Sequence, residues 1–342
     1  MKLSIITINY NNAEGLRKTL ASVAAQTYAH IEHIIVDGGS TDGSVEIIRQ
    51  YDSANGSQGG GSQTGQTSRT IQTGRTKVCH QIRWISEKDK GIYHAMNKGI
   101  EIALGKRIVN EDHTSIPIAL SPHRLIASDY IQILNSGDIL AANDVTERMV
   151  EAMRRQGYQA SRLSGDKVPI ENGVAIFYGN MIKEWPDGKR VKDTCGGGEY
   201  TPESFLYFYK GTLNHDCAYI RSDLFEKYGL YNEDMKICSD WEWYVRAIVL
   251  GGEKTVYTNI DVTVFDMTGI SESNGKNKDI ITKERREYLE SILPAAVLRD
   301  YDRYCFPIEQ YQRLKKYHLW GLVWFLERVI FKIEKWTIGN GR

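Results

Sequence analysis

The sequence is poor in cysteine, and its five cysteines are odd in number, scattered and never in Cys-x-x-Cys spacing. This pattern argues against a disulfide framework and a zinc site, and it favours a reducing compartment. No uninterrupted run of about 18 apolar residues occurs, so no membrane-spanning helix is expected. The amino terminus, MKLSIITINYNN, has an apolar stretch too short for a signal peptide.

An excess of charge of either sign is also missing. Lys plus Arg and Asp plus Glu both number 43 in a chain of 342 residues. Without a global positive field, nucleic acid is not an expected partner. The chain is long enough for one large α/β domain with appendages or for two domains.

Two phosphate-binding motifs are absent as well. The turn after the first apolar run reads TINYNNAEG, which contains neither GxGxxG nor GxxxxGK[ST]. A Rossmann dinucleotide site and a P-loop are therefore both excluded at this position.

What is present is an alternation of strands and helices. Residues 3–8 and 31–36 are short β-branched runs, and a helical pattern covers roughly 13–26 between them. This is a βαβ unit, whose two strands should be parallel neighbours. Further strands are expected at 81–86 and 129–135, each followed by a helix, which gives an α/β fold with a mostly parallel central sheet.

Two stretches interrupt this alternation. Residues 53–76 are rich in Gly, Ser, Gln and Thr, and they predict a flexible loop or linker outside the sheet. Residues 106–128 contain two prolines but enough apolar residues to dock somewhere. Because this second insertion leads into the amino end of the strand at 129–135, we expect it at the opposite edge of the sheet from any active site, without a catalytic role.

Polar groups follow all four expected parallel strands. Ligands of open parallel sheets bind beyond the carboxyl ends of the strands, so this coincidence predicts a site there. Asp138, in IQILNSGDIL, poses the sharpest question, because Asn-Ser-Gly-Asp is also ordinary turn chemistry. The polar residues at the other strand ends favour a ligand role for Asp138, and its carboxylate is suited to Mg²⁺ or Mn²⁺. The residues at these strand ends are Thr7, Asn9 and Tyr10; Asp37, Gly38 and Gly39; Glu87, Asp89 and Lys90; and Asn135 to Asp138.

The motifs TINYNN, VDGGSTDGS, SEKDKGIYHAMNKGI and DYIQILNSGD, in this order, resemble the nucleotide-sugar half of inverting, family 2 type glycosyltransferases of the GT-A fold. The later segment NHDCAYIRSDLFEKYGLYNEDMKICSDWEWYVRAI is similar to the acceptor half of bacterial members that build surface polysaccharides. The resemblance covers 1–52, 81–105 and 129 to about 250. It implies a catalytic domain over 1–250, with insertions 53–76 and 106–128. The pattern of the last 60 or so residues is helical, so a mostly helical region is expected over 251–342.

Carried over by position, the resemblance implies a role for each matching residue. Asp138 falls on the metal position of the DxD-type motif, although Gly137 stands where many relatives have a second Asp. Asp240, in SDWEW, falls on the general base that deprotonates the acceptor hydroxyl, with Glu242 as the fallback. His215 is either a structural histidine or a group facing the acceptor. The nucleotide is expected to contact Thr7, Asn9, Tyr10, Asp37, Asp89, Lys90, Gly91, Asn97 and Ser136.

The resemblance thus implies a metal-dependent enzyme that moves a sugar from a nucleotide-diphosphate donor, a UDP-sugar first of all. The implied acceptor is a saccharide or lipid-linked saccharide in capsule, O-antigen or exopolysaccharide assembly. Two rivals stay open, a sugar nucleotidyltransferase and a non-catalytic sugar-binding protein.

The last part of the chain carries an apolar stripe at helical spacing, within residues 317–336. Trp and Lys side chains beside the stripe suit a membrane interface, and packing against the catalytic domain is the alternative. The sequence is therefore expected to belong to a cytoplasmic protein that is free or held at the inner face of the membrane.

Overall fold

The computed structural model describes residues 1–56, 67–73, 76–117, 128–156, 173–195, 201–268 and 277–339. The chain divides into two compact units, Met1–Arg285 and Arg286–Arg342. Within the described residues, no helix is both long and apolar enough to cross a membrane.

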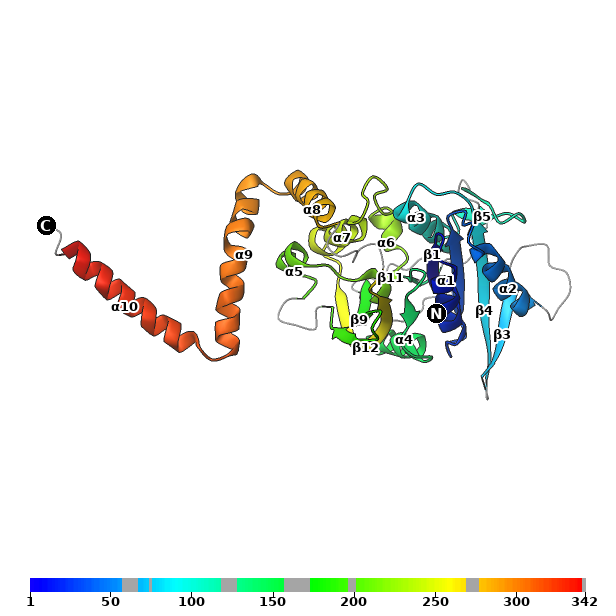
Figure 1. The fold of residues 1–342 in the computed structure, drawn as a ribbon, viewed down its shortest axis with the longest axis horizontal. Helices are drawn as coiled ribbons and strands as arrows, with labels where there is room; N and C mark the ends of the chain where they lie inside the picture. The colour runs from blue at the N-terminus through cyan, green and yellow to red at the C-terminus, as the bar shows by residue number, and fades with distance from the viewer. Residues whose placement is uncertain are drawn as a thin grey trace. The chain divides into compact units, whose positions relative to one another are not determined.

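A ten-stranded mixed sheet organises the first unit, in the order β3-β4-β2-β1-β7-β11-β9-β12-β8, with β10 paired to β9 (Figure 1). The strands β1, β2, β4 and β7 run parallel to one another, and β11 runs antiparallel between β7 and β9. The expected α/β fold with a mostly parallel sheet is confirmed. The strands span Leu3–Asn9 (β1), Ile31–Asp37 (β2), Thr67–Thr73 (β3), Thr76–Ser86 (β4), Tyr130–Ile133 (β7), Ile139–Leu140 (β8), Ile176–Glu184 (β9), Arg190–Asp193 (β10), Ala218–Arg221 (β11) and Thr255–Asp266 (β12).

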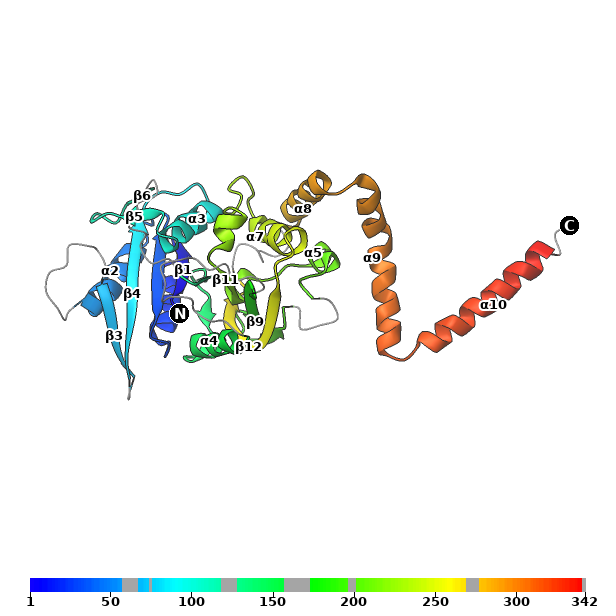
Figure 2. The same cartoon turned by 180° about the vertical axis from the view of Figure 1, so that it is seen from behind.

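Helices cover both faces of this sheet (Figures 1 and 2). Leu16 of α1 and Ile48 of α2 pack with Ile35 of β2 and Trp84 of β4 in one buried cluster. The next residue along β2, Val36, points the other way and meets α3, as alternation along a strand requires. The helices of this unit include α1 (Ala13–Ala24), α2 (Ser44–Gly56), α3 (Ile92–Ala103), α4 (Val145–Arg155), α5 (Phe205–Lys210), α6 (Leu224–Lys227) and α7 (Ser239–Tyr244), which continues as a π-helical turn, η2 (Val245–Leu250).

The helix α3 lies very close to the sheet because of a glycine. A Cβ on Gly99 would come 2.4 Å from a methyl group of Ile6. This close packing seats α3 directly on β1 and β2.

The expectation for residues 53–76 was wrong in part. The stretch Thr67–Thr73 forms β3, which pairs antiparallel with β4 at the edge of the sheet, and β4 begins at Thr76 rather than at residue 81. Thr-rich sequence with little apolar content can still extend a hairpin at a sheet edge, because backbone hydrogen bonds need no particular side chain. Residues 57–66 and 74–75 lie outside the described residues.

The placement of the second insertion was also wrong. Two short strands, β5 (Arg107–Val109) and β6 (Ser115–Pro117), pair antiparallel in a small hairpin that is separate from the main sheet. The Ser86 N–H at the end of β4 donates to the His113 carbonyl at 2.9 Å, so the hairpin lies at the carboxyl end of β4. Sequence periodicity shows where an insertion interrupts the regular pattern, but it does not show where the insertion docks in the folded protein. Residues 118–127 lie outside the described residues.

The remaining helices are α8 (Lys278–Ile292), α9 (Ala295–Lys316) and α10 (Trp320–Gly339), together with a short 3-10 turn, η1 (His215–Cys217). The expected boundary at residue 250 falls before β12, which belongs to the main sheet. The helical character expected of the last 60 or so residues is confirmed.

Candidate active site at the carboxyl ends of the parallel strands

Side chains from three strand ends meet around Asp37, at the end of β2. One carboxylate oxygen accepts from Asn9 Nδ2 at 2.8 Å and Ser40 Oγ at 2.6 Å. The other accepts from Ser86 Oγ at 2.7 Å and from the N–H groups of Ser40 and Gly39 at 2.9 and 3.2 Å. Asp37 is fully buried. Its acceptor positions are all used, so a direct bond to a nucleotide base would have to replace one of these donors.

The loop after β4 closes over the same place. A Cβ on Gly38 would lie 2.6 Å from Asp89 Oδ2 and 3.1 Å from the ring of Tyr10, so a larger residue there would push the Asp89 side chain away. Asp89 also accepts from the Gly91 N–H at 3.0 Å. Tyr10 is 67% exposed and presents an open aromatic face, and the Lys90 side chain is exposed as well. These side chains line the part of the site expected to hold the nucleotide.

Two residues expected at the nucleotide use their polar atoms elsewhere. Thr7 is fully buried and its hydroxyl lies 3.0 Å from His33 Nε2 within the sheet. Asn97 exchanges hydrogen bonds with the main chain of Tyr231, and its Nδ2 also donates to Glu233 at 2.9 Å. Asn97 therefore ties α3 to the segment before α7.

The loop after β7 carries Ser136 and Asp138. Asn12 donates to the Ser136 carbonyl at 2.9 Å, which joins this loop to the turn after β1. Gly137 has a φ of 113°, a conformation that favours glycine. An Asp at Gly137 would therefore strain this turn.

Asp138 is buried beside other carboxylates. Its Oδ1 accepts from the Asp266 N–H at 2.9 Å, and no described residue donates to its Oδ2. Burial raises the pKa of Asp138 well above its ordinary range, and the neighbouring charge of Asp216 raises it further. A cation at this place would relieve that cost.

Asp266, at the end of β12, was missed in the sequence. Its Oδ2 would lie 3.7 Å from a Cβ on Gly137, so this second carboxylate is close to the Asp138 loop. The strand-end rule that selected Asp138 would also have found Asp266 in YTNIDVTVFD. Among the described residues, no group of three or more His, Cys, Asp or Glu side chains is arranged to hold a metal ion.

A second set of contacts surrounds Asp240, at the start of α7. His215 Nδ1 lies 3.1 Å from Asp240 Oδ2, and the Tyr93 hydroxyl, which also contacts the Ile237 carbonyl, lies 3.1 Å from Oδ1. His215 Nε2 lies in turn 3.1 Å from Asn135 Nδ2, at the end of β7. A hydrogen-bonded chain thus connects Asp240 to the loop that carries Asp138.

The His215 and Asp240 side chains shift each other's pKa. Burial lowers the pKa of His215, but the hydrogen bond and charge of Asp240 outweigh burial and raise it above 6.5. Burial likewise raises the pKa of Asp240, but the contact with His215 outweighs it and leaves it below 3.8. The side chains are 16% and 14% exposed, so the pair faces a partly open place.

Glu242, the fallback base, is held elsewhere. Its Oε2 pairs with Arg246 at 3.0 Å, and Arg246 also donates to the carbonyl groups of Tyr228 and Leu230. Tyr93, which contacts Asp240, gave no signal in the sequence because the two residues are 147 positions apart.

The chain is similar to known glycosyltransferases in sequence and in fold. Residues 4–113 match the model of the family described as Glycosyl transferase family 2. An uncharacterized glycosyltransferase of Mycobacterium tuberculosis is 27% identical over 272 residues, which cover 78% of this chain and 76% of that protein. A PGL/p-HBAD biosynthesis glycosyltransferase of Mycobacterium bovis is 23% identical over 281 residues, covering 82% of this chain and 81% of that one.

Among solved structures, residues 1–349 of S. aureus TarS in complex with UDP-GlcNAc superpose with a TM-score of 0.52 and 14% identity. The match covers 86% of this chain and 69% of that one. At this identity the similarity establishes the shared fold.

Proposed function

Because residues 4–113 match the model of Glycosyl transferase family 2 and the fold is shared with TarS, we propose that the protein moves a sugar from a nucleotide-diphosphate donor to an acceptor hydroxyl with inversion at the anomeric carbon. A UDP-sugar is the proposed donor, and the UDP-GlcNAc complex of TarS supports this choice. The observation that carries the proposal is the Asn135–His215–Asp240 chain, which joins the Asp138 loop to a second carboxylate.

The donor half of the site would bind the nucleotide. Tyr10 would contact the nucleotide base, because its ring is exposed beside Gly38, and Lys90 would contact the diphosphate. Asn9, Asp37, Asp89 and Gly91 shape the floor of this half by their mutual contacts.

A divalent cation, Mg²⁺ or Mn²⁺, fits the chemistry of the Asp138 end. Such ions prefer oxygen ligands and keep several waters, so one or two protein carboxylates are sufficient. Asp138 has a carboxylate oxygen without a described donor, and Asp266 lies beside its loop. When bound, the ion would supply positive charge for the diphosphate leaving group.

Asp240 is the proposed general base. An acceptor hydroxyl must lose its proton as it attacks, and a positioned carboxylate can accept it. Tyr93 and His215 fix the orientation of Asp240, each holding one of its two oxygens. An acceptor hydroxyl would displace one of these contacts to reach the carboxylate.

Thermal stability with nucleotide sugars tests the donor assignment. A ligand that binds only the folded state raises the unfolding temperature by mass action. We expect UDP-sugars with Mn²⁺ to stabilise the protein more than dTDP- or GDP-sugars do. The absence of stabilisation by any of them would contradict the proposal.

Hydrolysis of the donor separates the two rivals. A glycosyltransferase should release UDP slowly from a UDP-sugar when Mn²⁺ is present and the acceptor is not. A sugar nucleotidyltransferase should instead require a sugar phosphate and a nucleoside triphosphate, and a sugar-binding protein should show neither reaction.

The proposed acceptor is a saccharide or lipid-linked saccharide of the bacterial surface. The name of the M. bovis relative, a PGL/p-HBAD biosynthesis glycosyltransferase, supports a role in glycolipid biosynthesis. Capsule, O-antigen and exopolysaccharide units remain within this class.

The helix α10 supports contact with a membrane. Large apolar side chains on it are half or more exposed, among them Leu322, Trp324, Phe325, Ile330 and Ile333. Arg328 and Lys332 add positive charge for anionic lipids. We propose that 317–336 holds the enzyme at the cytoplasmic face of the membrane.

Truncation tests this part of the proposal. A chain that ends at residue 310 should lose binding to vesicles that contain phosphatidylglycerol but keep donor hydrolysis. Unchanged vesicle binding, or unfolding on truncation, would favour packing of this helix against the catalytic domain.

A further inference from the structure

The β5–β6 hairpin contacts the carboxyl end of β4 at several points. Its His113 carbonyl accepts from the Ser86 N–H, and the His113 ring stacks on Trp84 with 3.5 Å between the ring centres. Ser86 in turn donates to Asp37 at 2.7 Å, so the hairpin supports the floor of the donor half.

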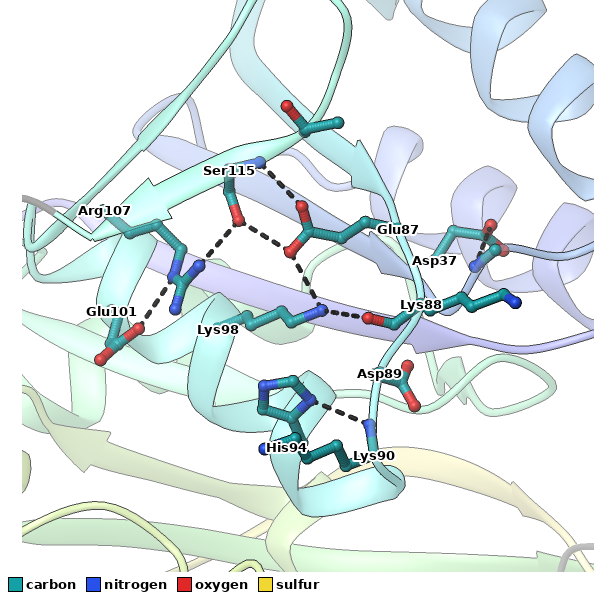
Figure 3. A network of polar contacts seen from close by, with 12 residues as sticks. Asp37, Glu87, Lys88, Asp89, Lys90, His94, Lys98, Glu101, Arg107 and Ser115 are labelled. Atoms are coloured by element: carbon teal, nitrogen blue, oxygen red, sulfur yellow. Dashed lines mark hydrogen bonds and ion pairs between the residues drawn. The ribbon is translucent and has the colours of Figure 1, made fainter.

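A polar network joins the hairpin to the loop of residues 87–91 (Figure 3). Both polar groups of Ser115 bond to Glu87, the N–H at 2.8 Å and the hydroxyl at 3.0 Å. Glu87 pairs with Lys98 of α3 at 3.0 Å, and Lys98 Nζ also donates to the Lys88 carbonyl at 3.0 Å. The network therefore holds the main chain of the loop at residues 87 and 88.

The same network is anchored on α3 a second time. Arg107 of β5 donates to Glu101 of α3 at 2.8 Å and to the Ser115 hydroxyl at 3.0 Å. The Ser115 hydroxyl thus lies between Arg107 and Glu87. Its loss would break both contacts while the Ser115 N–H kept its own bond.

The charges in this network depend on one another. The Lys98 side chain is 3% exposed, so its charge needs a partner inside the protein. Burial raises the pKa of Glu87, but Lys98 and Ser115 outweigh burial and keep it below 4.5. Glu87 therefore stays ionised at neutral pH and keeps its pairing with Lys98.

The loop so held presents charged side chains to the site. Lys88 and Lys90 are exposed, and Asp89 lies against Gly38 at the end of β2. A lysine that meets a diphosphate gains affinity when the ordering of its loop does not have to occur on binding.

From this arrangement we propose that the β5–β6 hairpin braces the donor loop, and that Ser115 is a positioning residue for the nucleotide diphosphate. This inference rests on the proposed function, because it assigns a role in donor binding.

Calorimetric binding of UDP with Mn²⁺ tests the brace. We expect Ser115→Ala to weaken UDP binding about threefold to tenfold, the usual consequence of losing one ordinary hydrogen bond, because the hydroxyl acts on the nucleotide only through the loop. Donor KM should rise by the same factor with kcat unchanged, because the hydroxyl supports binding rather than the chemical step. Ser115→Thr keeps a hydroxyl and should restore wild-type binding.

A matched control comes from the same strand. Ile116 is 51% exposed, and Ile116→Thr changes the hairpin without touching the network. It should leave UDP binding unchanged. Wild-type UDP binding by Ser115→Ala, or an equal loss in Ile116→Thr, would overturn the brace.

Two further outcomes keep the test decisive. If Ser115→Ala fails to fold, Arg107→Gln removes a bond to the same hydroxyl and should weaken UDP binding with the fold retained; unchanged binding overturns the brace. If the wild-type protein binds neither UDP nor GDP, the proposed function itself fails, and the inference fails with it.

Discussion

Two buried aspartates, Asp37 and Asp138, follow parallel strands of the same sheet but have opposite surroundings. Asp37 accepts five hydrogen bonds from side chains and main chain of the donor half. Asp138 accepts one main-chain bond and lies near Asp216 and Asp266. The donor half is therefore satisfied without a ligand, whereas the Asp138 end gathers carboxylates whose ionised form a bound cation would stabilise.

This difference teaches how to separate a scaffold carboxylate from a ligand carboxylate. Both residues are strand-end aspartates followed or preceded by Gly and Ser, so composition does not distinguish them. The number of donors around each carboxylate does. A buried acid with few donors and acidic neighbours is costly, and such a cost is typical of functional sites.

The largest effect is expected on the transfer rate, when Asp240, the proposed general base, is replaced. Asp240→Asn should lower the transfer rate by roughly two to four orders of magnitude, the usual range for a positioned base, with UDP binding preserved. Steady-state transfer and calorimetry measure the two quantities. An equal loss of UDP affinity would make Asp240 a binding or structural residue.

Removing the Asp37 carboxylate, which accepts five hydrogen bonds, should lower the stability of the fold. Asp37→Asn replaces acceptor positions by an amide N–H that faces donors, and it should lower the free energy of unfolding by about 2–3 kcal/mol. Denaturant unfolding measures this change. If Asp37→Asn left stability unchanged, the donor half would not be the satisfied scaffold that its hydrogen bonds indicate.

Removing the Asp138 carboxylate should have the opposite effect on stability. The folded-state pKa of Asp138 is raised, so its ionisation opposes folding at pH above about 4 and has no such effect below the unfolded value. Asp138→Asn, measured without metal at pH 7, should therefore be as stable as the wild type or more stable. A clear loss of stability would identify Asp138 as a structural turn residue.

The smallest effect concerns the pH dependence of the His215 and Asp240 pair. The raised pKa of His215 stabilises the fold fully below 6.5, and this contribution is lost as the pH rises through the folded-state value. The lowered pKa of Asp240 stabilises above 3.8 and is lost as the pH falls below it. The stability difference between wild type and His215→Gln should therefore be largest between these values and shrink at alkaline pH. A difference independent of pH would exclude the ion pair.

The sequence predicted the parts of the fold that follow from local patterns. The βαβ unit, the strand at 129–135 and the helices that flank it in the chain follow from periodicity and are confirmed. The edge strand β3 was missed because its Gly, Ser and Thr neighbours carry no apolar pattern. The hairpin at 107–117 was misplaced because docking depends on tertiary contacts such as Ser115 with Glu87.

The site was predictable only where one rule applied. Strand ends selected Asp138 and Asp37, but no local signal showed that one carboxylate would be saturated and the other not. The donors around Asp37 come from three strand ends, and the contacts of Asp240 come from positions 93 and 215. These contacts join residues far apart in the sequence, so they exist only in the folded protein. The assigned roles of these residues stay predictions.

Metal-dependent hydrolysis of a UDP-sugar by matched proteins tests the central claim most directly. Wild-type protein and Asp138→Asn would be compared with Mn²⁺ and with EDTA, and the fold of each would be checked by thermal unfolding. The account predicts that Mn²⁺ stimulates UDP release by the wild type and has no effect on the folded Asp138→Asn variant. Equal stimulation of both proteins would contradict it, and would make Asp138 the turn residue that its Asn-Ser-Gly-Asp sequence first suggests.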